Sequence, residues 1–215
     1  TFSELSLVQG VFSKLSFGTH GYKTKEATYS KKRNKSSTIL RISQAESNGY
    51  RGHSSYKNKS FFFKHTIDLE KVKLIMNSLY FDSPYAFDPG GLTIESVNEN
   101  RTQARDRNVL FDAQESVKQL QAGFALDWKT VAGTVKSSLY YSNRDFIGLL
   151  PFTNGGHVEL NRDFAGLELS LNSRFNEFEW MFGVSAQSQA DDRKRFQNNE
   201  GVKGEIAMDQ LESFD

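Results

Sequence analysis

Arginine and aromatic side chains recur in and beside the segments that connect predicted strands, and together they suit an anionic ligand. A guanidinium can donate two parallel hydrogen bonds to a carboxylate, and aromatic rings can pack on the apolar parts of the same ligand. The candidate ligand-binding residues are Arg101, Arg105, Arg107, Arg144, Tyr85, Phe87, Phe146 and Phe152. The alternative is that the arginines bridge neighbouring loops, for example Arg105 with Asp106 or Asp112.

The residues that could perform catalysis do not have the spacing that catalytic or metal-binding motifs require. The four histidines are scattered, and no two stand at the spacing of metal ligands. They are His20, His53, His65 and His157. No serine lies in a nucleophile elbow, no glycine-rich phosphate loop follows a strand, and the absence of cysteine excludes thiol catalysis and disulfides. We therefore predict that the protein is not an enzyme and holds no cofactor or metal of its own.

The amino-acid composition limits the classes of protein to which the chain can belong. The chain has 215 residues, 37% of them hydrophobic, and a mean hydropathy of -0.57. No apolar run approaches the ~18 residues of a membrane-spanning helix, so a helical membrane protein is excluded. A membrane β-barrel is not excluded, because alternation dilutes its apolar residues with polar ones. The formal net charge of +1 gives no electrostatic reason to expect nucleic acid as a partner.

Apolar and polar residues alternate with a period of two, which predicts β-strands. The clearest segments are 120–128, 131–141, 167–174 and 178–187, and weaker ones are 11–17, 22–30, 40–42, 60–69 and 72–80. Many approach the ~9–11 residues that a tilted membrane strand requires. We predict an all-β fold, an antiparallel up-and-down transmembrane β-barrel fragment of about nine or ten strands from a larger barrel.

The connections between these strands are expected to be short at one end of the sheet and long at the other. Short turns are predicted near residues 70–71, 129–130 and 176–177. Long connections are predicted at roughly 84–116, 146–162 and from 191 onward, and they contain all three prolines and the acidic pair Asp191-Asp192. Membrane barrels have short turns on one side and long loops on the other.

Aromatic residues are expected to form two belts flanking an aliphatic band. Trp128, Phe178 and Trp180 would lie near the short turns, and Tyr80 and Tyr141 at the opposite end. The alternative is that these rings fill the core of a soluble β-sandwich, because alternation alone does not separate the two folds.

Charged residues indicate which face of the sheet would meet lipid. A Lys or Arg at the middle of a bilayer costs about 2–4 kcal/mol. We therefore expect the polar alternate positions to face the barrel lumen; the charged residues among them are Lys136, Glu168, Arg174 and Glu179. His65 is an exception, because it lies among apolar neighbours on its strand.

Three motifs in succession resemble TonB-dependent outer-membrane receptors of the ferric-siderophore and ferric-citrate type. The strongest runs from Asn143 to Phe152 (NRDFIGLLPF), followed by Gly155-Gly156 and by Asn161 to Gly166 (NRDFAG). The other two are Asp88 to Thr93 (DPGGLT), followed by Arg101, Ala104-Arg105, Asn108 and Phe111-Asp112, and Gly49 to Ser54 (GYRGHS). The resemblance covers nearly the whole chain.

The resemblance implies a location and a function. Members of this family have an N-terminal plug and a barrel of 22 strands, and they import an iron chelate across the bacterial outer membrane with energy delivered by TonB. Residues 1–215 are expected to form a partial barrel domain without the plug. The expected partners are outer-membrane lipid, a ferric-siderophore-like ligand and, through the plug, TonB. The open alternatives are an outer-membrane barrel enzyme and a soluble β-sandwich binding module.

Overall fold

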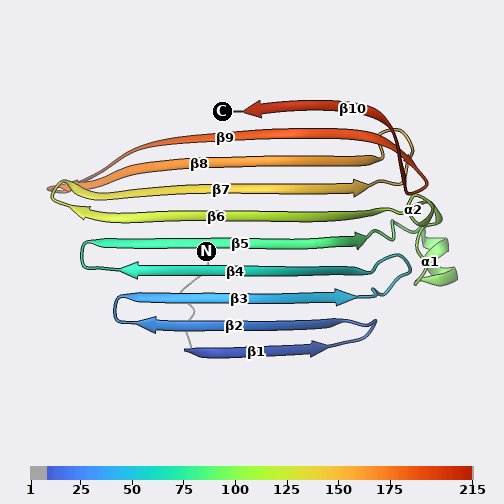
Figure 1. The fold of residues 1–215 in the computed structure, drawn as a ribbon, viewed down its shortest axis with the longest axis horizontal. Coiled ribbons are helices and arrows are strands. Elements are labelled where there is room, and N and C mark those ends of the chain that lie inside the picture. Colours follow the sequence, from blue (N-terminus) through green and yellow to red (C-terminus); the bar gives the residue numbers. More distant parts are fainter. Residues whose placement is uncertain (1–8, 215) are drawn as a thin grey trace.

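A computed structural model describes residues 9–214, which form one antiparallel sheet with two short helices at one end (Figure 1). Its ten strands pair in chain order. They are β1 (Gly10–Phe17), β2 (Lys23–Arg33), β3 (Ser36–Ser47), β4 (Tyr56–Asp68), β5 (Val72–Phe87), β6 (Gln114–Thr130), β7 (Gly133–Leu149), β8 (His157–Phe175), β9 (Phe178–Asn199) and β10 (Val202–Phe214). The helices α1 (Ile94–Asn100) and α2 (Asp106–Leu110) lie between β5 and β6. Neither helix, nor any other in this described part, is long and apolar enough to cross a membrane.

The predicted all-β, up-and-down architecture is confirmed. Each strand is antiparallel to its neighbours, and β5 to β9 have between 16 and 22 residues. These strands exceed the ~9–11 residues that cross a bilayer at a tilt. They therefore reach well beyond the band in which their residues alternate most clearly.

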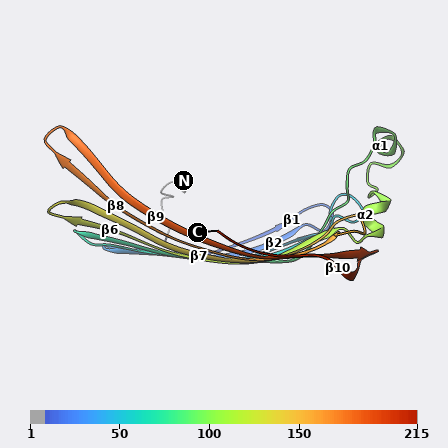
Figure 2. The ribbon, with the colours of Figure 1, turned by 90° about the horizontal axis from the view of Figure 1, so that it is seen from above.

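The sheet is curved and, within residues 9–214, open. β1 and β10 each pair on one side only, and every strand between them pairs on both. Figure 2 shows the sheet nearly edge-on as a bowed layer, with α1 on the concave side. The long loops and both helices lie at one end of the strands (Figure 1).

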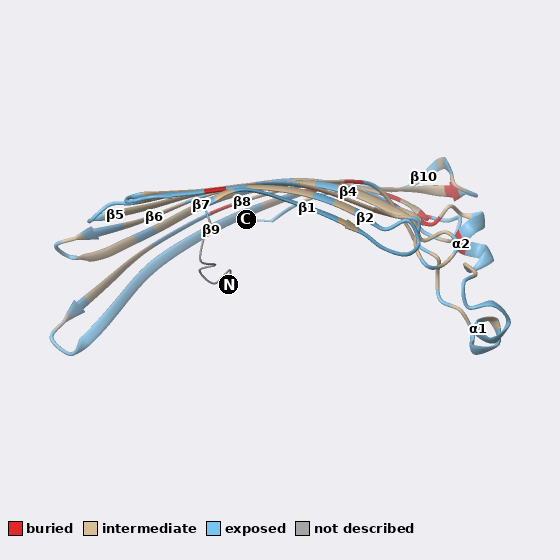
Figure 3. Ribbon diagram, turned by 90° about the horizontal axis from the view of Figure 1, so that it is seen from below, coloured by how far each residue is buried: buried red, intermediate tan, exposed pale blue. Residues whose placement is uncertain are grey.

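The described residues make a single layer, which contradicts the β-sandwich alternative. Buried residues are few (Figure 3). The hydrophobic ones are Ala113, Val117 and Val158. Strand residues that a sandwich would seal between two sheets remain open, such as Leu167 at 48% and Val184 at 69% exposure. The aromatic side chains therefore do not fill an inner core.

The connections follow the predicted asymmetry, with two corrections. Turns at one end span residues 34–35, 69–71, 131–132 and 176–177, whereas loops at the other span 18–22, 48–55, 88–113 and 150–156. The predicted long connection at 146–162 is wrong in extent, because strand structure continues on both sides of 150–156. The predicted connection from 191 onward is wrong: β9 continues to Asn199, and a two-residue turn leads into β10.

The prediction that Pro84 lies in a long connection is also wrong, because Pro84 is inside β5. The pairing of β5 with β6 shifts between Ser83 and Ala86, so Pro84 occupies a β-bulge. Proline has no N–H to give to a neighbouring strand, and a bulge is one of the few places in a sheet that tolerates it.

Candidate functional site

One face of the sheet is apolar over several neighbouring strands, and we call it the apolar face. Phe124 of β6 lies between Met76 of β5 and Leu139 of β7, and Leu139 lies opposite Leu167 of β8. The next row towards the short turns is Ile67, Leu74, Leu126, Ser137, Leu169 and Val184. A third is Val72, Trp128, Val135, Leu171 and Phe182. No Lys, Arg, Asp or Glu stands in these three rows between β4 and β9.

The opposite face is polar, and we call it the polar face. The rows between those of the apolar face include Lys73, Asp127, Lys136 and Ser170, and also Asn77, Gly123, Tyr140, Gly166 and Gln187. Lys136 and Glu168 lie on this face as expected, and Arg174 pairs with Glu179 near the turn between β8 and β9. In the rows named here, charge is therefore separated from apolar surface from β4 to β9.

His65 lies on the apolar face, and the structure supplies a partner for its ring. Nδ1 of His65 is 2.9 Å from the hydroxyl of Thr38, its neighbour across β3 and β4. The ring also stacks parallel to that of Phe63. A hydrogen bond reduces the cost of placing this polar ring among apolar neighbours.

Towards the loops the apolar face ends: Asn143 and Asp163 lie in the row of Leu120, and the next row, which we call the polar row, is polar on every strand from β2 to β9. It consists of Lys25, Gln44, Lys59, Asp82, Lys118, Asp145, Asn161 and Asp192. The Asn161 side chain donates a hydrogen bond of 2.5 Å to Asp145. An open groove of about 560 Å³ follows this row between β5 and β9. The charges alternate only from Lys59 to Asp145 along this row.

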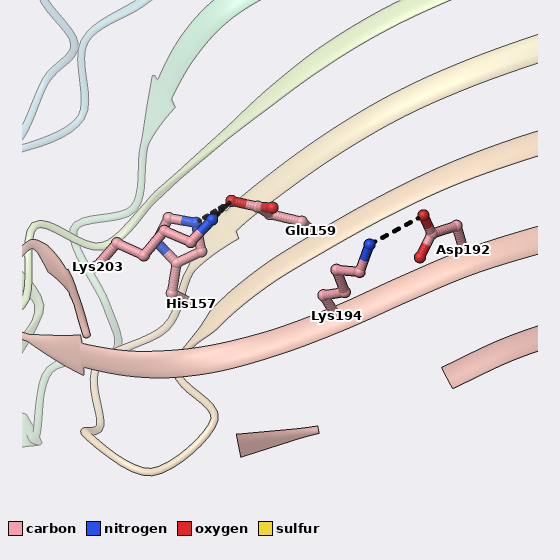
Figure 4. Close-up of polar contacts among 5 residues, drawn as sticks. All are labelled: His157, Glu159, Asp192, Lys194 and Lys203. Atoms are coloured by element: carbon pink, nitrogen blue, oxygen red, sulfur yellow. Dashed lines mark hydrogen bonds and ion pairs between the residues drawn. The ribbon is translucent and has the colours of Figure 1, made fainter. Parts of the chain in front are cut away.

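Charged side chains continue beyond the polar row towards the loops (Figure 4). Lys203 of β10 donates a 2.6 Å hydrogen bond to Glu159 of β8, and His157 Nε2 lies 3.0 Å from the same Glu159 oxygen. Lys194 pairs with Asp192 at 3.2 Å. The Lys203–Glu159 bond joins β10 to β8, whereas the Lys194–Asp192 pair lies within β9. Within residues 9–214, no group of three or more His, Asp or Glu side chains is arranged to hold a metal ion.

The predicted aromatic belts lie at two levels of the strands. Trp128, Phe178 and Trp180 are near the short turns. Trp128 pairs with Val72 of β5 and with Val135 of β7. Tyr80 lies eight residues from Val72 along β5, and Tyr141 lies six residues from Val135 along β7. The Tyr141 hydroxyl donates to Asp163. The two levels fit the predicted arrangement, and contact with lipid interfaces stays a prediction.

Arg51 holds the loop 48–55 against the loop 88–113. Its guanidinium donates to the backbone oxygens of Gly90 at 2.6 Å, Pro89 at 3.0 Å and Gln103 at 2.9 Å. The backbone N–H of Gly52 adds a bond of 2.8 Å to Thr102. A guanidinium carries five N–H donors in one plane, so it can bond several carbonyl oxygens at once. Two of the family-like motifs therefore contact each other.

Asn108 of α2 fixes the start of the loop 88–113 from inside. Its side chain is buried, and Nδ2 donates to the backbone oxygen of Asp88 at 3.2 Å and to its carboxylate at 3.1 Å. Gly90 has a φ of +68°, and an added Cβ would lie 2.5 Å from Oδ1 of Asn108. Only glycine fits this position without strain.

Asn198 of β9 joins three connections at the loop end. Its side chain has 0% exposure and donates to the backbone oxygens of Phe111 at 2.9 Å and Leu150 at 3.0 Å. Its Oδ1 accepts from the N–H of Gly201 at 2.8 Å. The loops 88–113 and 150–156 and the turn 200–201 are thereby bonded to one buried amide.

The exposed helix α1 is part of the connection 88–113. Its N-cap is Thr93, whose hydroxyl accepts a hydrogen bond from the N–H of Ser96. The backbone N–H of Glu95 and, to a smaller extent, the Thr93 hydroxyl lower the pKa of the Glu95 carboxyl below its ordinary value. The cap satisfies donors that the first helical turn leaves without partners.

Several solved structures share this fold. No protein-family profile and no curated protein sequence matches the chain. The ferric citrate transporter FecA in its unliganded form aligns with a TM-score of 0.69 at 14% identity, the siderophore receptor PiuA from Acinetobacter baumannii with 0.64 at 11%, and the copper transporter OprC with 0.62 at 14%. Each alignment covers 94% of this chain.

The fold is that of a section of a TonB-dependent receptor barrel. The chain spans about a third of the matched structures, 32% of FecA and OprC and 37% of PiuA. The matched structures are two transporters and a receptor.

The predicted ligand arginines do not form one pocket in this barrel section. Arg101, at the end of α1, lies over the ring of Tyr50 at 5.8 Å. Arg107 donates to the backbone oxygen of Pro151 at 2.6 Å and lies over Phe111, so its role is to join two loops. For Arg107 the loop-bridging alternative therefore fits the contacts.

Arg105 and Arg144 remain open to solvent at the loop end of the sheet. Arg105 precedes α2 and forms no ion pair with Asp106 or Asp112 in the structure. Arg144 lies on the polar face of β7, with its guanidinium 5.8 Å from the centre of the Phe146 ring. These two guanidinium groups can still bind an anionic ligand.

The predicted aromatic residues fall into separate places as well. Tyr85 and Phe87 pack together at the end of β5, and Phe87 also contacts the ring of His53 at 4.6 Å. Phe146 lies beside Arg144, whereas Phe152 is in the loop 150–156. Any ligand that touches all four rings would have to bridge β5 and β7.

The sequence analysis missed a basic part of the polar face on β8 and β9. Arg162 shares a register row with Arg144 and binds Asp191, while Arg193 and Arg195 continue along β9. These positions fell in segments predicted as connections, including Asp191, which is buried within β9. Extending the alternation of residues 167–174 towards 157 would have placed Arg162 on the polar face.

Proposed function

We propose that this chain forms part of the wall of an outer-membrane receptor barrel that imports a ferric siderophore or a similar metal chelate. The observation that carries the proposal is the separation of an apolar from a polar face in the central rows from β4 to β9. Lys or Arg on the apolar face would cost about 2–4 kcal/mol at mid-bilayer, so the polar face is assigned to the lumen. The likeness in fold to a ferric citrate transporter and a siderophore receptor supports the same proposal.

The height of the apolar face suits an outer membrane. From Trp128 to Leu120 the strand β6 advances by eight residues, about 27 Å at ~3.4 Å per residue. At a tilt of ~40° this corresponds to roughly 20 Å along the membrane normal, close to the ~25 Å apolar band of such barrels. We propose that the outer edges of β1 and β10 pair with further strands of the same receptor, because lipid does not tolerate open sheet edges.

Ligand capture is proposed to occur at the loop end. Arg105 and Arg144 offer exposed guanidinium groups, and Phe146 offers a ring beside one of them. The hydrogen bonds of Arg51 and of the buried Asn108 and Asn198 hold the surrounding loops in one arrangement, which reduces the ordering cost of binding. Transport then requires movement of the family's plug by TonB and no covalent chemistry on this chain.

The test is uptake of radioactive iron by cells that lack other chelate receptors. Ferric citrate and a ferric hydroxamate are supplied separately to cells with and without this receptor, and with and without TonB. We expect accumulation of at least one chelate only when both proteins are present. Uptake that is independent of the receptor for both chelates and for a copper chelate, or absence of the receptor from the outer-membrane fraction, would contradict the proposal.

A site variant connects the uptake to the structure. Arg144→Ala should raise the chelate concentration for half-maximal uptake, because it removes an exposed anion-binding group. Arg174→Ala is the matched control, since Arg174 also lies on a strand and is exposed but is near the short turns. Equal effects of the two substitutions would remove Arg144 from the binding site.

A further inference from the structure

Four lysines gather on β2 and β4, on the same side of the sheet as the apolar face. Lys25 and Lys59 belong to the polar row with Gln44 between them, and Lys23 and Lys57 occupy the next row with Glu46 between them. We call Lys23, Lys25, Lys57 and Lys59 the lysine patch. With ~3.3 Å per residue and ~4.8 Å between strands, their Cα atoms outline a rectangle of about 7 by 10 Å.

The lysine patch carries an excess of positive charge that its neighbours do not cancel. In the described part of the chain none of the four lysines forms an ion pair, and Glu46 is the one acid between them. Asp82 faces Lys59 from β5 and adds a second acid at the border. Further along the polar row acids prevail, with Asp82, Asp145 and Asp192 against Lys118. The basic excess is therefore confined to β2–β4.

Apolar side chains begin directly below the lysine patch. The adjacent row is Ala27, Ile42 and Phe61, and the next is Tyr29, Leu40 and Phe63. An open groove of about 380 Å³ connects the two regions, and its lining includes Leu15, Lys25, Glu26, Ala27, Ile42 and Lys59. A ligand that matches this surface has an anionic end and a hydrocarbon body.

We propose that the lysine patch binds the phosphate-bearing headgroup of an anionic membrane lipid, whose acyl chains lie against Ile42 and Phe61. The inference rests on the proposed membrane placement of the barrel. Each lysine close to an anionic headgroup raises the affinity for that lipid about fivefold. Free phosphate matches only the lysines, whereas a lipid matches both the lysines and the apolar rows beneath them.

The test compares lipid selectivity in bilayers. The full-length receptor is reconstituted in phosphatidylcholine with traces of spin-labelled phosphatidylglycerol or spin-labelled phosphatidylcholine, and electron paramagnetic resonance gives their relative association constants. Wild-type protein should prefer phosphatidylglycerol. The variant Lys23→Gln/Lys25→Gln/Lys57→Gln/Lys59→Gln should lose at least about fivefold of that preference. If it does not assemble, the pair Lys25→Gln/Lys59→Gln replaces it with a smaller expected loss.

A matched control removes the same charge from the polar face: Lys14→Gln/Lys64→Gln/Lys73→Gln/Lys136→Gln. This control should keep the wild-type preference. Equal losses in both variants, or none in the lysine-patch variant, would overturn the inference. Displacement of the labelled lipid by excess inorganic phosphate, compared with chloride at equal ionic strength, would also overturn it. A receptor that does not enter the bilayer would refute the membrane placement itself, whereas normal assembly without lipid selectivity would refute only the lysine patch.

Discussion

Arg162 and Asp191 lie opposite each other on β8 and β9, and the guanidinium donates two hydrogen bonds of 2.7 and 2.5 Å to the carboxylate. The Asp191 side chain is 9% exposed, whereas that of Arg162 is 40% exposed. Arg144 lies on the other side of Arg162 in the same row. Like charges directly opposite in a sheet repel, so Asp191 offsets repulsion between the two arginines.

We expect Arg162→Ala to lower the free energy of unfolding by about 1–3 kcal/mol, because it leaves the buried Asp191 charge without its partner. The range is below that of a fully buried pair since water reaches Arg162. Urea unfolding in detergent, followed by tryptophan fluorescence, measures the change. Arg174→Ala is the control: its ion pair with Glu179 is 4.0 Å long and 70–80% exposed, and should matter by less than ~0.5 kcal/mol. Equal losses would contradict the assigned role.

Asn198→Ala should release the loops at one end of the sheet. The substitution leaves two carbonyl oxygens and one N–H without their buried partner, at a cost of about 2–3 kcal/mol. Amide hydrogen exchange in residues 88–113 and 150–156 should become faster, while exchange near the turn 131–132 should not change. The neighbouring exposed Asn199→Ala is the control, and an exchange pattern identical in the two variants would argue against the bridge.

Arg51→Lys tests whether the shape of the guanidinium matters in addition to its charge. An ammonium group cannot reproduce the fixed fork that reaches the carbonyl oxygens of Pro89, Gly90 and Gln103. We expect faster hydrogen exchange in the loops 48–55 and 88–113 and lower chelate uptake. Arg105→Lys serves as the exchange control because that arginine is exposed. Preserved exchange rates in Arg51→Lys would show that charge alone is sufficient.

A pair of adjacent substitutions distinguishes the two faces of β8. Leu167→Arg places a charge on the apolar face and should cost about 2–4 kcal/mol if that face meets lipid. Glu168→Arg places the same residue on the polar face and loses only a 3.2 Å bond from Ser138. Both native side chains are exposed, so a protein surrounded by water would tolerate the two changes alike. Heat-modifiable gel mobility after refolding into bilayers measures assembly, and equal yields would argue against membrane insertion.

The middle of each long strand was predictable, but its loop-side half was not. In β8 the odd positions Leu167, Leu169 and Leu171 are apolar, whereas His157, Glu159 and Asn161 continue the same face with polar side chains. The period of two persists while the contrast between the faces disappears. The segments 146–162 and 191 onward were therefore interpreted as connections.

The candidate site was predictable in residue type but not in contacts. Arg144 and Phe146 were predicted as separate ligand-binding residues, and the structure places the guanidinium 5.8 Å from the centre of the ring. The roles of Arg51 and Asn198 depend on backbone carbonyls from 38 to 87 residues away in sequence. Backbone acceptors occur at every residue, so composition and spacing do not indicate which of them a side chain will reach.

The amino-acid sequence by itself determined a β-sheet with one apolar and one polar face, because side chains of a strand alternate and each must match its surroundings. Tertiary structure decided where the apolar face ends and which loops join. Register aligns Lys118 with Asp145 and Asn161 into one polar row, and the packed loop end brings Arg51 and Asn198 to their carbonyl partners. Both depend on distances between segments far apart in the chain, which are set only when neighbouring strands pair.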